Sequence, residues 1–238
     1  MLNNILAALP FMNEAKAQIV INAFWPLLKA ALVYTIPLSI VSFIIGLLIA
    51  LAVALIRVVP QEGMVHRFFY GVARFYVSVI RGTPLLLQLF IIFYGLPEIG
   101  LKLDPVPTAI IAFSLNIGAY ASETVRSAIL SIPKGQWEAG FSIGMTYMQT
   151  FRRIVLPQAL RVAVPPLSNT FVGLVKETSL ASLVLIPELM KASQVIVARN
   201  YEFILIYTEA GLIYWVICTV LTHMQGKMEK RLDRYVAK

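Results

Sequence analysis

The sequence is poor in charge and contains almost no cysteine or histidine. Only 13% of its 238 residues are charged, about half the share that is usual in a soluble domain. The single cysteine, Cys218, allows no disulfide within the chain and lies in an apolar run, where packing is its expected role. The two histidines, His66 and His223, match no metal-ligand spacing, so neither a metal site nor another cofactor is predicted.

Several sequence signatures are also missing. The GxxxxGK[ST] motif does not occur, so the chain carries no P-loop for a nucleotide. The N-terminus lacks a basic leader and a small-residue cleavage pattern, so no removable signal peptide is expected. The net charge of +8 is not interleaved with aromatic residues, which argues against a nucleic-acid partner. The loops hold no nucleophile–base pair, which argues against a membrane enzyme.

What the sequence does contain is apolar residues, which make up 59% of the chain. A helix of roughly 20 apolar residues crosses a bilayer. Three segments meet this requirement directly: 26–56, 107–130 and 202–225. The segment 156–176 meets it if Pro165-Pro166 is tolerated within a span, and 67–97 is interpreted as one span that bends near Gly82-Thr83-Pro84. We therefore predict an all-α integral membrane protein with five transmembrane helices.

The distribution of basic residues predicts the orientation. With the N-terminus outside, 14 of the 20 Lys and Arg residues fall on the cytoplasmic side, as the positive-inside rule requires. The prediction is N-out and C-in, with membrane lipid as a partner. The segment 133–157 is then a cytoplasmic loop.

Three further segments complete the predicted organisation, in which the transmembrane domain is 26–225: one precedes this domain, one lies within it and one follows it. Residues 1–25 form an outer amphipathic segment, in which Leu2, Ile5, Leu6 and Leu9 share one helical face. Residues 178–198 are too short to span and are expected as a re-entrant or surface helix on the outer side. Residues 226–238 form a basic cytoplasmic tail.

The 133–157 loop interrupts the apolar runs with a distinct local pattern. Pro133 and Gly135 end the preceding span, and a short helix is predicted from Gln136. Gly144 then interrupts, and Thr146 with Gln149 has the spacing of a capping box, in which the two residues cap the start of a second helix reciprocally. We predict two short helices joined by a bend at Gly144.

The faces of these short helices allow two interpretations. Trp137 and Phe141 share one face, with Glu138 to the side, which suits a small projection that contacts a partner. Trp137 and the pair Arg152-Arg153 also suit a helix that rests on lipid headgroups. Local physics slightly favours the lipid contact, whereas the glycine bend and the sharp exit at Leu156-Pro157 fit the projection.

Polar residues within spans are costly unless they face a cavity or a partner. Ser168, Asn169 and Thr170 follow the Pro165-Pro166 pair, so they either line a solute pathway or accompany a packed kink. Both interpretations stay open.

A second polar set lies on one face of the span 107–130. It consists of Asn116, Tyr120 and Glu123, spaced for a helix. Glu123 could meet a substrate ammonium group, but an ion pair with Arg126 three residues on is favoured.

The 133–157 loop also resembles a known motif. Glu138-Ala139-Gly140, Gly144, Ile154 and Leu156-Pro157 match the spacing E-A-A-x3-G-x9-I-x-L-P of the EAA loop in permease subunits of binding-protein-dependent ABC importers, with Gly140 in place of the second Ala. The segments RGTPLLLQLF, AYASETVRSAI and LVKETSLASL resemble the polar amino-acid branch. The segments KGQWEA, SIGMT and LPQALRVAVPPLSNTF are most similar to L-cystine permeases.

The resemblance implies a type I ABC importer permease fold and a non-catalytic subunit in the cytoplasmic membrane of a bacterium. In that family two permease subunits, identical or paired, form the pathway, a cytoplasmic ATPase dimer hydrolyses ATP, and a solute-binding protein docks outside. The implied coupling residues are Trp137, Glu138, Ala139, Gly140, Gly144, Arg152, Arg153, Ile154, Leu156 and Pro157, with Glu138 to Gly140 in the ATPase cleft and Leu156-Pro157 setting the angle of the next span. The alternative is a secondary transporter or channel that works alone, although no internal repeat supports it.

Overall fold

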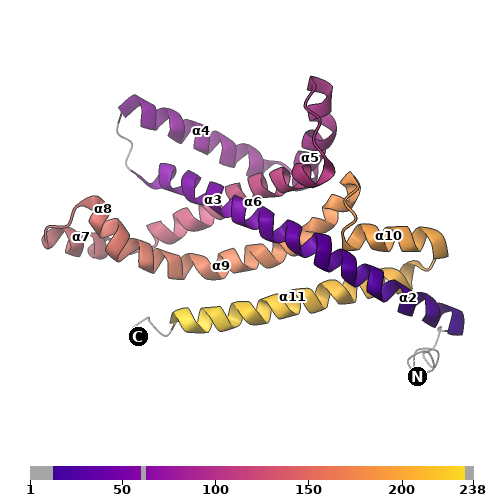
Figure 1. The fold of residues 1–238 in the computed structure, drawn as a ribbon. Coiled ribbons are helices and arrows are strands. Elements are labelled where there is room, and N and C mark those ends of the chain that lie inside the picture. Colours follow the sequence, from indigo (N-terminus) through magenta and orange to yellow (C-terminus); the bar gives the residue numbers. More distant parts are fainter. Residues whose placement is uncertain (1–12, 60–62, 234–238) are drawn as a thin grey trace.

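Long helices that run roughly in one direction dominate the fold (Figure 1). The computed structural model describes residues 13–59 and 63–233, and within these ranges all regular structure is helical. The predicted stripe of Leu2, Ile5, Leu6 and Leu9 lies outside the described residues. The α-helices are α2 (Glu14–Ala30), α3 (Ile36–Val58), α4 (Gly63–Gly82), α5 (Leu85–Phe90), α6 (Pro105–Leu130), α7 (Lys134–Ser142), α8 (Tyr147–Thr150), α9 (Leu156–Glu177), α10 (Leu189–Asn200) and α11 (Phe203–Asp233).

The packing of α3 on α6 forms the centre of the fold. The buried face of α3 carries a small residue every fourth position, namely Ser42, Gly46, Ala50 and Ala54. A Cβ atom placed on Gly46 would lie 2.7 Å from Ile117 Cγ2, and one on Gly118 would lie 2.6 Å from Ile49 Cγ2. Each helix thus inserts an isoleucine at a glycine of the other, the close backbone approach that membrane helices use.

Three prolines are accommodated by a widened helical turn immediately before them. The π-helical turns Ala31–Thr35, Ile91–Gly95 and Phe151–Val155 are followed by Pro37, Pro97 and Pro157. In each, the residue before proline donates its N–H to the carbonyl five residues back. A proline ring clashes with the carbonyl four residues back, and the wider turn moves that carbonyl aside without ending the helix.

Because of these turns, two helices are longer than the sequence suggests. One runs from Glu14 to Val58, so no break separates the described part of the predicted outer segment 1–25 from the span at 26–56. Another runs from Tyr147 to Val184 and contains the predicted span 156–176, with Pro165-Pro166 in its interior. The predicted tail 226–238 likewise continues α11 as helix as far as Asp233.

The predicted bend at Gly82-Thr83-Pro84 is confirmed, but it is sharper than a kinked single span. The α4 axis and the helix Leu85–Ile99 meet at 107°. The buried Gln88 amide closes the corner by donating to the carbonyl of Ile80 at 2.8 Å and to Thr83 Oγ1 at 2.9 Å. Asn116 Nδ2 donates to Gln88 Oε1 at 3.1 Å, which ties the corner to α6.

The segment 178–198 consists of a 3-10 turn (Thr178–Val184) and α10, which meets the preceding helix at 51°. Glu188, fully buried, caps α10 by accepting from the N–H groups of Met190 and Lys191 at 2.9 and 2.7 Å. Its carboxylate also accepts from Tyr214 Oη at 2.9 Å. The cap therefore joins α10 to α11, beside a cluster that α10 and α11 share with α2.

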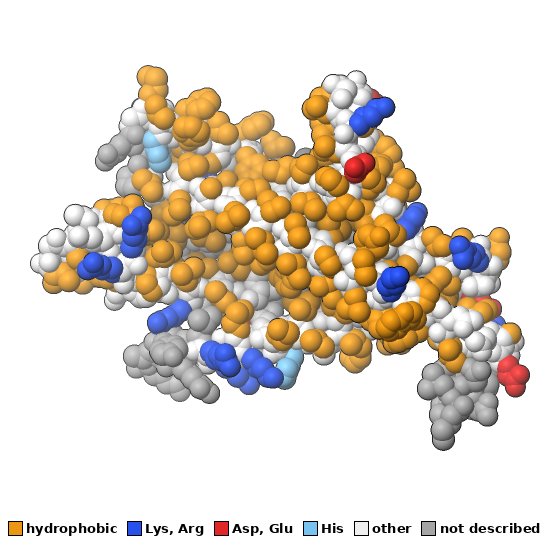
Figure 2. Space-filling model, in the orientation of Figure 1, with side chains coloured by type: hydrophobic (Ala, Val, Ile, Leu, Met, Phe, Trp, Pro, Cys, Tyr) orange, Lys and Arg blue, Asp and Glu red, His pale blue; other side chains and the backbone are white. Residues whose placement is uncertain are grey.

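Two helices of the described chain, Glu14–Val58 and Phe203–Arg231, are long and apolar enough to cross a membrane, and the number rises to four if each bent pair is one span. In Figure 1 the N- and C-terminal ends lie at opposite ends of the molecule, and α7 and α8 lie at the C-terminal end. Apolar side chains cover most of the visible face in Figure 2, as expected for helices surrounded by lipid.

The first testable prediction concerns the α3–α6 contact. Gly118→Ala should lower the thermal unfolding midpoint of the purified protein in detergent, because overpacking of a tight contact costs about 1–3 kcal/mol. Gly211→Ala is the matched control, since no atom lies within 4 Å of a Cβ at that position. Equal midpoints for the two variants would contradict the assigned packing.

Candidate functional site

The 133–157 loop folds as two helices that turn back on each other. Pro133 precedes α7, and a bend follows in which Gly144 adopts a φ of +80°. Two hydrogen bonds close the end of α7, from Met145 N to Gly140 O at 3.1 Å and from Gly144 N to Phe141 O at 2.9 Å. This is a Schellman motif, which favours glycine at its left-handed position. The predicted bend at Gly144 is confirmed.

The start of the second helix is also as predicted. Thr146 Oγ1 accepts from Gln149 N at 3.3 Å, and Gln149 Oε1 accepts from Thr146 N at 2.9 Å. The capping box is therefore complete. However, the helix that begins with α8 does not stop at Leu156-Pro157, because the π-helical turn Phe151–Val155 joins α8 to α9. Leu156-Pro157 therefore lies inside a continuous helix and makes no corner there.

Gly140 lies on the inner face of α7, against α8. It is buried, and a Cβ atom at this position would lie 2.5 Å from Thr150 Cγ2 and 2.7 Å from Thr150 Oγ1. The two helices can approach this closely only because the residue has no side chain. Gly140 is thus a contact within the loop, whereas the sequence motif grouped it with the residues expected to meet a partner.

Trp137 also faces inward. Its ring stacks on Tyr147 with centroids 5.0 Å apart and lies 6.3 Å from the ring of Phe151, both at 24°. It packs against a buried cluster in which Ile129 of α6 and Ile132 just beyond it meet Val155 of the π turn and Ala159 of α9. The 133–157 loop is therefore fixed to the ends of α6 and α9.

The outer surface of the loop carries the remaining motif residues. Glu138 and Ala139 are exposed, as are Phe141 (47%) and Ile143 (75%) beside them. Arg152, Arg153 and Pro157 are exposed, and Ile154 and Leu156 are half-buried. Gln158 Nε2 donates to Gln136 Oε1 at 3.1 Å, which holds this outer face to α9. The result is a projection whose outer surface carries one carboxylate, that of Glu138, beside the exposed apolar side chains of Phe141 and Ile143.

Glu123 is held by two arginines in the described structure. Arg126 donates from Nη2 to Glu123 Oε2 at 3.0 Å, which confirms the favoured i, i+3 pair. Arg57 of α3 pairs with the other carboxylate oxygen. Sequence reasoning missed Arg57, because 66 residues separate it from Glu123 and no local pattern joins them.

The other predicted polar residues of α6 diverge from Glu123. Asn116 is buried at the corner formed with Gln88. Tyr120 is 44% exposed, and the Arg81 guanidinium lies 5.4 Å from its ring centroid, within range of a cation–π contact. The three residues share a helix face in sequence but engage different neighbours.

The three polar residues of α9 do not converge on one point either. Ser168 and Thr170 donate to the carbonyls of Val164 and Pro166, both at 2.9 Å. The exposed Asn169 accepts from Gln225 Nε2 of α11 at 2.9 Å. Among the described residues no group of three His, Cys, Asp or Glu side chains could hold a metal ion.

Comparison with known proteins identifies the class of protein to which these features belong. Residues 46–234 match the family described as "Binding-protein-dependent transport system inner membrane component". The chain belongs to this family, whose members are membrane components of ABC transporters. More specifically, it is a permease subunit of an amino-acid ABC importer, which makes it a transport component of the cytoplasmic membrane.

Individual relatives narrow the comparison. The chain is 55% identical over 238 residues to the L-cystine transport system permease protein TcyB of Bacillus subtilis (strain 168), covering 100% of this chain and 99% of that one. It is 34% identical over 216 residues to the glutamine transport system permease protein GlnP of Escherichia coli (strain K12), covering 89% and 96%. A crystal structure of an amino acid ABC transporter with histidines superposes with a TM-score of 0.81 at 30% identity, over 87% of this chain and 95% of that one.

The second testable prediction concerns Gly140. Gly140→Ala should loosen the contact of α7 with α8, so trypsin should cleave after Lys134 about five times faster or more, since overpacking costs about 1–3 kcal/mol and opening exposes the backbone. Adding Thr150→Ala removes the two nearest atoms and should restore much of the protection. Gly173→Ala, in α9, has open space at its Cβ and leaves the cleaved bond unchanged, so it should be cleaved at the wild-type rate. If it is cleaved as fast as Gly140→Ala, the contact does not hold the loop.

Proposed function

We propose that the chain is the membrane permease of an ATP-driven, binding-protein-dependent importer of L-cystine, and that its 133–157 loop couples the membrane helices to a cytoplasmic ATPase dimer. The observation that carries the proposal is the division of this loop into a fixed inner face and a free outer face. Gly140 and Trp137 lock the inner face, while Glu138 and Ala139 remain exposed on a projection at one end of the molecule.

The coupling step follows from the continuity of the helix behind the projection. The helix that begins at Tyr147 ends at Val184, so α8 and α9 move as one body. ATP binding would draw the two ATPase subunits together, and a force on the outer face of α7 would tilt α9. Such a force shifts the pathway between outward- and inward-facing states only if docking differs in free energy between them.

The remaining components belong to the same proposal. Five spans with N-out and C-in orientation place the 133–157 loop in the cytoplasm and α10 on the side of an extracytoplasmic solute-binding protein. A second permease copy, or a paired permease, completes the pathway. Within it Asn116, Tyr120, Glu123, Ser168, Asn169 and Thr170 stay candidate lining residues, of which the exposed Tyr120 and Asn169 are the most accessible in this conformation.

L-cystine is proposed as the solute because of the relatives. Identity to the permease named for L-cystine transport is 55% along the whole chain, against 34% for the one named for glutamine. The alignment with the L-cystine permease covers the whole of this chain, so it includes the 133–157 loop and the helices that flank it.

The third testable prediction concerns the outer face of α7. Ala139→Trp should reduce ATP-dependent uptake in proteoliposomes about tenfold, because a bulky side chain at a docking contact removes more than 1 kcal/mol of binding. Membrane insertion and trypsin resistance should stay at wild-type level. Lys102→Trp, exposed in the loop before α6, is the control, and uptake unchanged in Ala139→Trp would argue against docking at this face.

The fourth prediction concerns energy source and solute. Reconstituted with its ATPase and binding protein, the chain should import radiolabelled L-cystine, and unlabelled L-cystine should compete where arginine and glutamine do not. A hydrolysis-deficient ATPase should abolish uptake, and a protonophore should leave it intact. Uptake that persists with the inactive ATPase but collapses with the protonophore would establish a secondary transporter instead.

A further inference from the structure

A long apolar groove opens on the face where α3, α9 and α11 come together. Its volume is about 810 Å³. The α3 wall includes Ile44, which is 54% exposed, and the α11 wall includes Met224, which is 62% exposed. The rings of Phe43 and Phe171, with centroids 5.0 Å apart, join α3 to α9 within the groove.

The groove changes character along its length. On α11 the lining starts at Leu221 and ends with the cations Lys227 and Arg231. Ten residues of helix separate Leu221 from Arg231, a rise of about 15 Å, which is the depth of about one bilayer leaflet. Apolar side chains line the deeper part, and positive charge stands at the terminal end.

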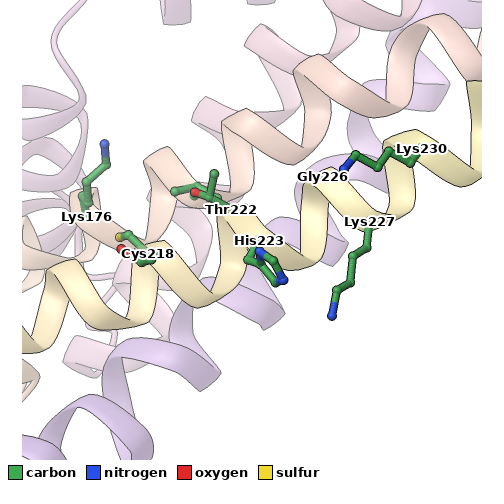
Figure 3. A pocket seen from close by; sticks show the side chains of 9 residues that line it. Lys176, Cys218, Thr222, His223, Gly226, Lys227 and Lys230 are labelled. Atoms are coloured by element: carbon green, nitrogen blue, oxygen red, sulfur yellow. The ribbon is translucent and has the colours of Figure 1, made fainter.

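A second groove adjoins the first and carries further positive charge. It has a volume of about 550 Å³ and shares Val172 and Lys227 with the first groove. Figure 3 shows its lining, in which Lys176 comes from α9 and His223, Lys227 and Lys230 come from α11. In the same orientation as Figure 1, Figure 2 shows Lys and Arg side chains gathered along the part of α11 near its C-terminal end.

Within the part of the chain whose side chains the structure describes, these cations form no ion pair with an acidic side chain. None of the ion pairs formed between described residues involves Lys227, Lys230 or Arg231. The nearby carboxylate of Glu229 accepts from Gln225 Nε2 at 2.8 Å. A ligand that satisfies the groove must therefore bring an anionic group to its end and an apolar body to its interior.

We propose that this groove binds an anionic phospholipid, with an acyl chain between α3 and α11 and the phosphate at Lys227 and Arg231. An acyl chain matches the apolar lining, and basic sites between membrane helices at the cytoplasmic side hold anionic headgroups. A polar amino acid would lose its hydration against mostly apolar walls, where Ser168 and Gln225 are the only uncharged polar side chains that line the groove. A second copy of the chain would have to bring acidic side chains to the cations, and this cytoplasmic end is itself basic.

Lipid binding at this groove is a property separate from the proposed transport of the solute. Its assignment to the cytoplasmic leaflet rests on the proposed C-in orientation, whereas occupancy of the groove does not. A lipid there would contact α3, α9 and α11 at once and would hold α9 in position relative to the other two helices.

The test is native mass spectrometry of the full-length chain, titrated with phosphatidylglycerol and with phosphatidylcholine. Wild type should bind phosphatidylglycerol at least about tenfold more tightly. Lys227→Gln with Arg231→Gln should weaken phosphatidylglycerol binding about thirtyfold, since each surface cation contributes about a factor of five, and should leave phosphatidylcholine unaffected. Ile44→Trp should weaken both lipids by filling the groove, and Met224→Trp fills it from α11 if the first variant does not fold.

Controls separate this groove from general attraction to lipid. Lys102→Gln with Arg199→Gln removes the same charge elsewhere and should bind lipid as wild type does; an equal loss in this variant would overturn the proposal. Glycerol 3-phosphate, which carries the phosphate without acyl chains, should not displace the lipid, and displacement would overturn the use of the apolar groove. If Ile44→Trp breaks an oligomer while lipid binding is unchanged, a second copy occupies the groove and the proposal fails.

Discussion

The close packing of α3 on α6 is the contact on which the other elements depend. In a bilayer, the association of two apolar helices gains no hydrophobic free energy, because lipid tails are as apolar as the helices. Close packing and interhelical hydrogen bonds must therefore hold the two helices together. Gly46 and Gly118 provide the space for this packing. Other faces of α6 receive further elements: Tyr76 Oη of α4 donates to the Leu115 carbonyl at 2.6 Å, and Asn116 bonds to Gln88 at the α5 corner.

Helix continuity is the second constraint, and prolines would be expected to destroy it. A π turn ahead of Pro37 and another ahead of Pro157 let the helices pass through instead of ending. The helix from Tyr147 to Val184 therefore connects the 133–157 loop to the opposite end of the molecule. A projection attached to such a helix can transmit force only if its own contact is rigid, which the Gly140–Thr150 contact and the Trp137 stack provide.

Local rules predicted what local chemistry determines. The Gly144 bend, the Thr146–Gln149 capping box and the corner at Pro84 depend on a few neighbouring residues, and all three were predictable from the sequence. The continuous helices were not predictable, because a proline usually marks the boundary of a helix. The π turn that lets a helix continue through a proline has no simple sequence signal. The Arg57–Glu123 pair and the lipid-sized groove depend on which helices become neighbours, which a single sequence does not reveal.

The EAA-type motif illustrates the same limit within a single short segment. Its residues stand together in sequence, yet consecutive positions on a helix point in different directions. Glu138 and Ala139 face outward, while Gly140 faces Thr150. The small third residue is thus required by a contact within the chain, whatever binds outside. Glycine occurs here, where the pattern has alanine, because the opposing residue is the β-branched Thr150, whose Cγ2 and Oγ1 already fill the space of a Cβ. The departure from the pattern therefore tightens the internal fit and leaves the outer contact surface unchanged.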